Sequence, residues 1–294
     1  KKNWVLRHTE LVTNYDIDFL WFDGYGFPYG DYGQEVCQAY FNHSLNTHGK
    51  IKGIVAGKFH EEPSTVKDIE RGGSNEILDY PWQGTLTFGS WFYKNDRPIR
   101  HNARTVIEML TDMISKNGNM LLNVELRPDG TIPPDHKIIL DDIGAWIKLN
   151  QEAIYASKPW EIFGDNLNSS LKTLEEQNIG EADLKALKEQ AKAEHFNERT
   201  VESLPYGPTE VRFTTNKNDL YIFVLNPATG PIHLPSLGSD SDYSPNRIKS
   251  ISMIGSKESI KYDQTENELI LYIPENRPNQ YTTVFKVRGI LPKQ

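Results

Sequence analysis

The sequence predicts an α/β part with a parallel sheet, followed by an antiparallel β-sandwich. Strand-like and helix-like patterns alternate over residues 17–150 with short connections, which is typical of a parallel sheet covered by helices. From residue 209 onward, short runs of alternating polar and apolar residues are separated by turn residues, which is typical of a sandwich. A chain of 294 residues is long enough for both parts.

The first predicted strand, residues 18–23, is a run of large apolar side chains that ends in an acid, Asp23, followed by Gly24. A strand that is apolar on both faces is expected to be buried. Trp21 and Asp23 point to the same side, because successive side chains of a strand alternate between its faces. A carboxylate at the carboxyl end of such a strand lies where α/β barrels and open α/β sheets carry their catalytic and ligand-binding residues. The alternative is an acid that starts a turn or caps the next helix.

Further helices and strands follow in the α/β part, and Gly49 and Gly118 mark the ends of two of the helices. Four strand–helix units fit these residues, whereas a closed eight-stranded barrel takes about 250 residues. The α/β part could therefore supply only about half of such a barrel. The expected elements are a helix at 35–48, a strand at 51–59, a Gly-rich irregular segment at 68–76, an extended stretch at 84–93, a helix at 103–117, a strand at 119–126 and a helix at 134–149.

The character of the chain then changes, which gives three predicted domains. Residues 1–163 hold the α/β part. Residues 164–208 are highly charged with only a thin apolar stripe, and we expect a helical insert and linker there. Residues 209–294 are expected to form the sandwich, with strands at 210–215, 219–226, 249–255, 259–263, 268–274 and 281–287.

Composition limits the partners of the chain. No apolar run approaches the ~20 residues that a membrane helix needs, which argues against a membrane protein. The net charge of -8 and the lack of a Lys/Arg cluster argue against nucleic acid as a partner. The single cysteine, Cys37, excludes a disulfide within the chain, and the sequence has no paired-cysteine motif and no G-x-G-x-x-G.

Carboxylates near strand ends in an α/β array indicate glycoside hydrolysis, which needs two of them. One attacks the anomeric carbon or positions a water that does, and the other protonates the leaving oxygen. The aromatic side chains around them suit the apolar faces of a sugar, although such residues also build protein cores. The candidate carboxylates are Asp23, Glu61, Glu62, Asp68, Glu70, Glu76 and Asp79.

Four blocks of the α/β part carry a resemblance to a known family. They are "YDIDFLWFDG", "KFHEEPSTVKDIERGG", "YPWQGTLTFGSWFY" and "SKNGNMLLNVELRPDGTIP". In this order they resemble the catalytic half of the family 29 glycoside hydrolases, the α-L-fucosidases. The later runs "EVRFTTNKNDLYIFVLN", "IKSISMIGS" and "YDQTENELILYIP" resemble that family's C-terminal β-sandwich. The resemblance implies the C-terminal half of a TIM barrel followed by the sandwich, with the N-terminal half of the barrel missing or on a separate chain.

The resemblance also implies a reaction. It indicates a retaining exo-α-L-fucosidase that works through a covalent fucosyl-enzyme intermediate, with Asp23 as the nucleophile and without a metal or another cofactor. The implied substrate is a fucosylated oligosaccharide or glycoconjugate, and the implied location is secreted or periplasmic. Two alternatives stay open, a fucose-binding relative with impaired catalysis and a related glycosidase with a different sugar preference.

The acid/base of the family lies on a variable loop. In some members it falls twelve positions after a basic residue that ends the next strand. Here Lys58 ends that strand and Glu70 lies twelve positions on, so Glu70 is the predicted acid/base. Glu76 is the fallback, because a divergent branch uses an asparagine–glutamate pair. Other members place a glutamate after a tryptophan, but here Gln83 follows Trp82, and an amide has no titratable proton to give.

Four residues are predicted to bind the sugar. Trp21 corresponds to a tryptophan that shapes the fucose pocket, and Lys58 stands where the family often has an arginine, which offers a fork of donors that lysine lacks. His60 shares the strand face of Lys58, and Trp91 is expected on the side of the leaving group. Packing is the alternative role for both tryptophans, and a structural role is the alternative for His60.

Overall fold

The structure is a computed structural model that describes residues 1–25, 30–58, 65–69, 73–95, 99, 101–167, 185, 206–243 and 246–291. Its internal contacts divide the chain into two compact units. The first unit comprises Lys1–Glu70 with Tyr80–Thr85, and the second comprises Arg71–Asp79 with Leu86–Gln294.

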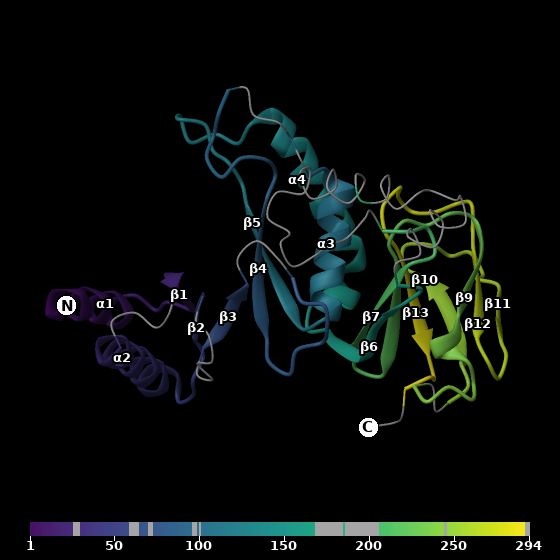
Figure 1. Cartoon of the computed structure of the whole chain (residues 1–294), viewed down its shortest axis with the longest axis horizontal. Helices are drawn as coiled ribbons and strands as arrows, with labels where there is room; N and C mark the ends of the chain where they lie inside the picture. The colour runs from purple at the N-terminus through teal and green to yellow at the C-terminus, as the bar shows by residue number, and fades with distance from the viewer. Residues whose placement is uncertain are drawn as a thin grey trace. The chain divides into compact units, whose positions relative to one another are not determined.

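The first unit packs two helices on one face of a sheet. Leu20 and Phe22 point into its core together with Val55, and α1 and α2 lie side by side on them (Figure 1). The helix predicted at 35–48 begins earlier, at Asp31, and ends at Gly49, whose φ of 68° is the left-handed conformation that glycine adopts readily. The elements are α1 (Lys2–Asn14), β1 (Phe19–Tyr25), α2 (Asp31–His48), β2 (Ile54–Lys58), β3 (Val66–Ile69) and the first part of β4 (Trp82–Thr87).

The sheet order is β1-β2-β3-β4-β5, where β5 is Gly118–Asn123. The pairs β1–β2, β2–β3 and β3–β4 are parallel, which confirms the predicted parallel sheet. The prediction of an irregular segment at 68–76 was wrong at its start, because β3 occupies Val66–Ile69. This strand was hidden in the sequence because its one buried residue is a polar one, Asp68. Within the described residues, no helix separates β2 from β3 or β3 from β4, so the strand–helix units are three rather than four.

The second unit combines two helices with two antiparallel sheets. One sheet has the strand order β10-β13-β8-β7-β6 and the other has the order β11-β12-β9. These sheets confirm the predicted antiparallel part of the fold. The elements are α3 (Ala103–Ser115), α4 (Pro134–Ile154), β6 (Lys158–Asp165), β7 (Val211–Asn216), β8 (Asp219–Val224), β9 (Gly230–Leu234), a 3₁₀ turn η1 (Pro235–Leu237), β10 (Ser250–Met253), β11 (Tyr262–Gln264), β12 (Leu269–Ile273) and β13 (Thr283–Arg288).

Two strands of these sheets were not predicted, β6 and β9. Strand β6 pairs antiparallel with β7 and crosses the predicted boundary between residues 163 and 164. The predicted helical insert lies almost wholly outside the described residues, so the three domain boundaries stay predictions. None of the helices in the described ranges combines the length and the apolar character needed to cross a bilayer.

Strand β8 is buried on both faces. Leu220 and Ile222 point into the core between the sheets, while Tyr221 and Phe223 point toward α3 and α4. Helices α3 and α4 therefore pack directly on the antiparallel sheet that contains β8 (Figure 1). Helix α4 is kinked at Asn150, directly after its predicted end at residue 149, and a further turn to Ile154 keeps Ala153 in contact with this core.

A cluster of four buried charges also joins α3 to β7, and we call it the buried ionic cluster. Arg212 Nε donates to Asp112 Oδ1 at 2.6 Å, and Lys116 Nζ donates to Asp112 Oδ2 at 2.8 Å. Arg212 Nη2 donates to Glu210 Oε1 at 2.9 Å. All four residues are at most 5 % exposed. Two positive and two negative charges make the cluster neutral as a whole.

Glu108, on α3 near this cluster, makes stability depend on pH. It is 8 % exposed, and burial raises its pKa from 4.5 to about 7, against the opposing charge of Arg104 and with the help of Glu210. The folded state then binds the proton more tightly than the unfolded state, so stability falls as pH rises from about 4.5 to 7 and the loss is complete above that range. We expect Glu108→Gln to escape this loss. Its stability relative to the wild type should rise by about 2 kcal/mol between pH 5 and 8.

Urea unfolding at the two pH values measures this difference. The matched control is Glu161→Gln, because Glu161 is exposed on β6 and should show no such rise. An equal effect of Glu108→Gln at pH 5 and pH 8 would contradict the assignment.

Candidate active site

The carboxyl ends of β1 and β2 bring Asp23 and Lys58 together. Lys58 Nζ lies 2.6 Å from Asp23 Oδ1. The Asp23 side chain is 69 % exposed, whereas that of Lys58 is 11 % exposed. The pairing of β1 with β2 shifts register between Phe22 and Tyr25, so the strand is irregular where Asp23 stands. The site thus presents an open carboxylate whose negative charge is stabilised by a nearly buried ammonium group.

The sheet face that carries Asp23 is open. Leu20 and Phe22 are buried on the other face, but Trp21 is 36 % exposed, so the prediction that β1 is buried on both faces was wrong. In this chain α1 and α2 cover only the face of Leu20 and Phe22, and β2 is the one strand that pairs with β1 among the described residues.

Two further polar side chains join this face from β3 and β4. Trp21 Nε1 donates to Asp68 Oδ2 at 2.7 Å, and Gln83 Nε2 lies 3.5 Å from the same oxygen. Asp68 is 4 % exposed and Gln83 is 7 % exposed. Lys58 Nζ lies 5.9 Å from the centre of the Trp21 ring, which is within reach of a cation–π contact. Strands β1 to β4 therefore each contribute a side chain to one connected polar group.

The sequence did not predict the contact of Asp68 with Trp21 and Gln83. Asp68 was one candidate carboxylate among seven, and Gln83 counted only as a lost acid. Asp68 and Gln83 are neighbours because β3 pairs with β4, and the sequence alone does not reveal this pairing. The predicted acid/base Glu70 and the predicted sugar contact His60 lie outside the described residues.

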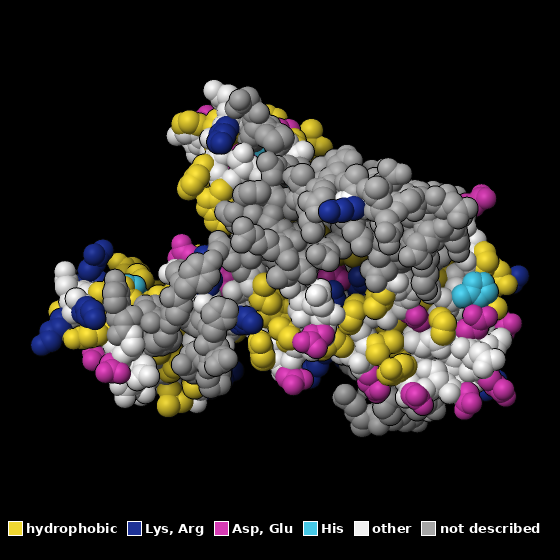
Figure 2. Space-filling model, in the orientation of Figure 1, with side chains coloured by type: hydrophobic (Ala, Val, Ile, Leu, Met, Phe, Trp, Pro, Cys, Tyr) yellow, Lys and Arg dark blue, Asp and Glu magenta, His cyan; other side chains and the backbone are white. Residues whose placement is uncertain are grey.

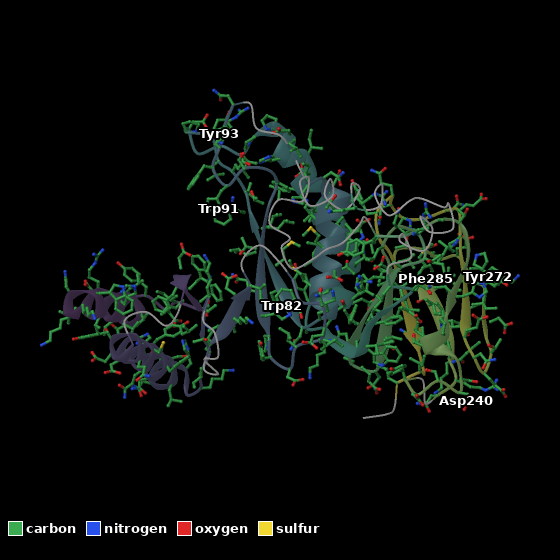
Figure 3. All side chains as sticks on the ribbon, in the orientation of Figure 1. Trp82, Trp91, Tyr93, Asp240, Tyr272 and Phe285 are labelled. Atoms are coloured by element: carbon green, nitrogen blue, oxygen red, sulfur yellow. The ribbon has the colours of Figure 1, made fainter. Side chains whose placement is uncertain are left out.

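The fallback acid/base, Glu76, lies in the second unit at the rim of a pocket of about 660 Å³. The pocket is lined by residues of β6 and by the loop that carries Asp240, labelled in Figure 3, and acidic side chains (magenta in Figure 2) are numerous over the sandwich. Leu78, two residues after Glu76, is hydrogen-bonded through its N–H and C=O groups to Lys116 and Asn117, immediately before β5. Glu76 thus lies two residues before a segment that is bound at the amino end of β5, a strand that rises about 16 Å to its carboxyl end.

Trp91 belongs to the second unit and lies on the turn that follows β4 (Figure 3). Asn123 Nδ2, at the end of β5, donates to the carbonyl oxygen of Trp91 at 3.0 Å. Glu125 Oε1 accepts from the backbone N–H of Ser90 at 2.9 Å, and Thr87 Oγ1 donates to Ser90 O at 2.8 Å. Three side chains at the carboxyl ends of β4 and β5 therefore fix the turn that presents Trp91.

Two family models match this chain. Residues 1–152 match the family model described as "Alpha-L-fucosidase", and residues 207–288 match "Alpha-L-fucosidase C-terminal domain". The plasma alpha-L-fucosidase of Homo sapiens is 27% identical over 169 residues, which cover 54% of this chain and 36% of that protein. The tissue alpha-L-fucosidase of Bos taurus is 39% identical over 179 residues, which cover 52% of this chain and 34% of that protein. The chain spans about a third of the length of these two relatives.

Solved structures show the same fold. An alpha-L-fucosidase superposes with a TM-score of 0.70 at 22% identity, covering 98% of this chain and 56% of the other. The Thermotoga maritima alpha-fucosidase in complex with fucose gives a TM-score of 0.68 at 22% identity, covering 97% and 55%. Such fucosidases combine a barrel with a β-sandwich, and the parallel and antiparallel sheets described above correspond to half of that barrel and to the sandwich. On the match of more than half of its residues to the family model, the chain belongs to the α-L-fucosidase family, a family of glycoside hydrolases.

Proposed function

We propose that this chain carries the catalytic carboxylates of a retaining exo-α-L-fucosidase. The observation that carries the proposal is the open carboxylate of Asp23 at the carboxyl end of β1, held 2.6 Å from the ammonium of Lys58. Family membership supplies the substrate class, a fucosylated oligosaccharide or glycoconjugate. Because the relatives are longer than this chain, the N-terminal half of the barrel is the proposed partner that completes the pocket. A secreted or periplasmic location stays a prediction.

In the proposed reaction, Asp23 attacks the anomeric carbon of fucose, and the bond to the leaving oxygen breaks while Glu70 gives that oxygen a proton. Glu70 then takes a proton from water, whose oxygen attacks the anomeric carbon and releases Asp23. Lys58 stabilises the anionic form of Asp23 that attack requires. The ring of Trp21 offers an apolar face to the sugar. Two displacements at one carbon return the product with the configuration of the substrate.

Hydrolysis of a nitrophenyl α-L-fucoside by the full protein tests this proposal. We expect turnover, with α-L-fucose as the first product detected by NMR before the anomers equilibrate. β-L-Fucose as the first product would overturn the retaining mechanism. Fucose binding without turnover would assign the chain to an impaired binding relative, and turnover of a different aryl glycoside in a parallel panel would assign another sugar preference.

Glu70 is the proposed acid/base in preference to Glu76. The catalytic and ligand-binding residues of such barrels lie at the carboxyl ends of the strands, whereas Glu76 lies two residues before a segment that is bound at the amino end of β5. We expect Glu70→Ala to lower kcat/KM by about 10²-fold for an alkyl fucoside, whose leaving group needs a proton. The loss should be much smaller for a nitrophenyl fucoside, because nitrophenolate leaves without one.

Glu76→Ala is the matched control for this substitution and should leave both substrates unaffected. The reverse pattern in the two variants would transfer the acid/base role to Glu76.

A further inference from the structure

We infer that Asp68 is a positioning residue that sets the orientation of Trp21, and that Gln83 is an amide because it adjoins Asp68. The effect of this positioning on sugar binding rests on the proposed function. The positioning itself does not, because it follows from the contacts of three side chains in the first unit.

The strand register explains how Asp68 reaches across the sheet to Trp21. Trp21 pairs with Ala56 of β2, and Ala56 pairs with Val66 of β3. Paired residues of a parallel sheet share a face, and Asp68 lies two positions after Val66 on that face. The short side chain of Ala56 leaves room above β2, so the indole lies across that strand and its Nε1 meets Asp68 Oδ2 at 2.7 Å.

The hydrogen bond to Asp68 restrains the orientation of the Trp21 indole. Trp21 is 36 % exposed in this chain, so packing covers only part of its ring. Within the described residues, its side chain makes a single hydrogen bond, the one to Asp68. A short bond to a buried carboxylate is among the stronger hydrogen bonds in proteins. Because Asp68 is 4 % exposed, it is itself held in place.

Gln83 stands opposite Asp68 in the pairing of β3 with β4. Its Nε2 lies 3.5 Å from the oxygen that accepts the Trp21 proton. A glutamate there would set a second carboxylate beside Asp68 in a buried place, where like charges repel strongly. The neutral amide of Gln83 is therefore explained by the adjacent carboxylate of Asp68 and need not indicate lost catalysis. We expect Gln83→Glu to disturb the contact between Asp68 and Trp21.

Asp68→Ala and Asp68→Asn in the full protein test the positioning directly. The readout is the set of indole N–H signals in a ¹H–¹⁵N NMR spectrum, where the chain's 6 tryptophans give one signal each and Trp21→Phe identifies the relevant one. We expect this signal downfield in the wild type, shifted upfield in Asp68→Ala, and intermediate in Asp68→Asn, which keeps a neutral acceptor. Asp18→Asn, at an exposed aspartate of the same unit, is the control and should leave the signal in place.

Activity provides the second readout. Asp68→Ala should lower kcat/KM for an aryl fucoside about 10-fold or more, the equivalent of one hydrogen bond to a charged group. Added to Trp21→Phe, it should cost little further, because the donor is already gone. An unchanged Trp21 signal in Asp68→Ala and Asp68→Asn, or full additivity with Trp21→Phe, overturns the inference. A shifted signal in a protein without fucosidase activity would support the positioning and overturn the proposed function instead.

Discussion

Asp23→Gly is expected to lower the hydrolysis of a nitrophenyl α-L-fucoside by roughly 10⁴-fold or more, because it removes the group that forms the covalent intermediate. The protein should still fold, since the Asp23 side chain is 69 % exposed and contributes nothing to the core. Asp18→Gly is the matched control. Asp18 is also an exposed acid with a lysine partner, Lys52 at 3.3 Å, and lies just before the same strand. Its loss should leave turnover unchanged.

Added azide makes the assignment of Asp23 specific. In Asp23→Gly, azide fits the space of the missing carboxylate and attacks the anomeric carbon from the same face, while nitrophenolate leaves with the bonding electron pair. The product should be a fucosyl azide of inverted configuration. In Glu70→Ala, azide should instead attack the intermediate on Asp23 and give the retained configuration. A retained azide from Asp23→Gly, or turnover close to the wild type without azide, would remove Asp23 from the role of nucleophile.

The sequence predicted β1 well because its physical signals agree. A continuous apolar run ending in an acid and a glycine specifies a strand and its carboxyl end without help from the rest of the chain. The prediction of burial on both faces failed, because burial depends on what packs against a strand, and in this chain the helices cover only one face of β1.

Strand β3 and the role of Asp68 were not predictable for a different reason. The buried residue of this strand is an aspartate, so the usual apolar alternation is absent. The indole that donates to Asp68 comes from a strand 47 positions earlier in the sequence. A buried polar side chain whose hydrogen-bond partner is distant in the sequence produces no local sequence pattern. The same holds for Glu125, whose partner Ser90 lies 35 positions away.

The buried ionic cluster is the second place where removing one side chain should have a large effect. Burial alone would raise the pKa of Asp112, but the charges of Arg212 and Lys116 outweigh burial and hold this pKa below its usual range. The carboxylate therefore stays ionised at neutral pH and balances two buried cations. Glu210 balances only part of that charge through its contact with Arg212.

We expect Asp112→Ala to lower the free energy of unfolding by about 3–5 kcal/mol, because it leaves two cations and one anion buried. Asp112→Ala combined with Lys116→Leu should recover part of this loss, since the remaining pair of Arg212 and Glu210 is neutral. Asp141→Ala is the matched control, because the pair of Asp141 with Lys137 has the same spacing on a helix but is more than 60 % exposed, and its loss should cost less than about 1 kcal/mol. Urea unfolding compares these three variants with Lys116→Leu alone. If the double variant were as unstable as the sum of its single substitutions, packing rather than charge balance would account for the role of the cluster in joining α3 to the sandwich.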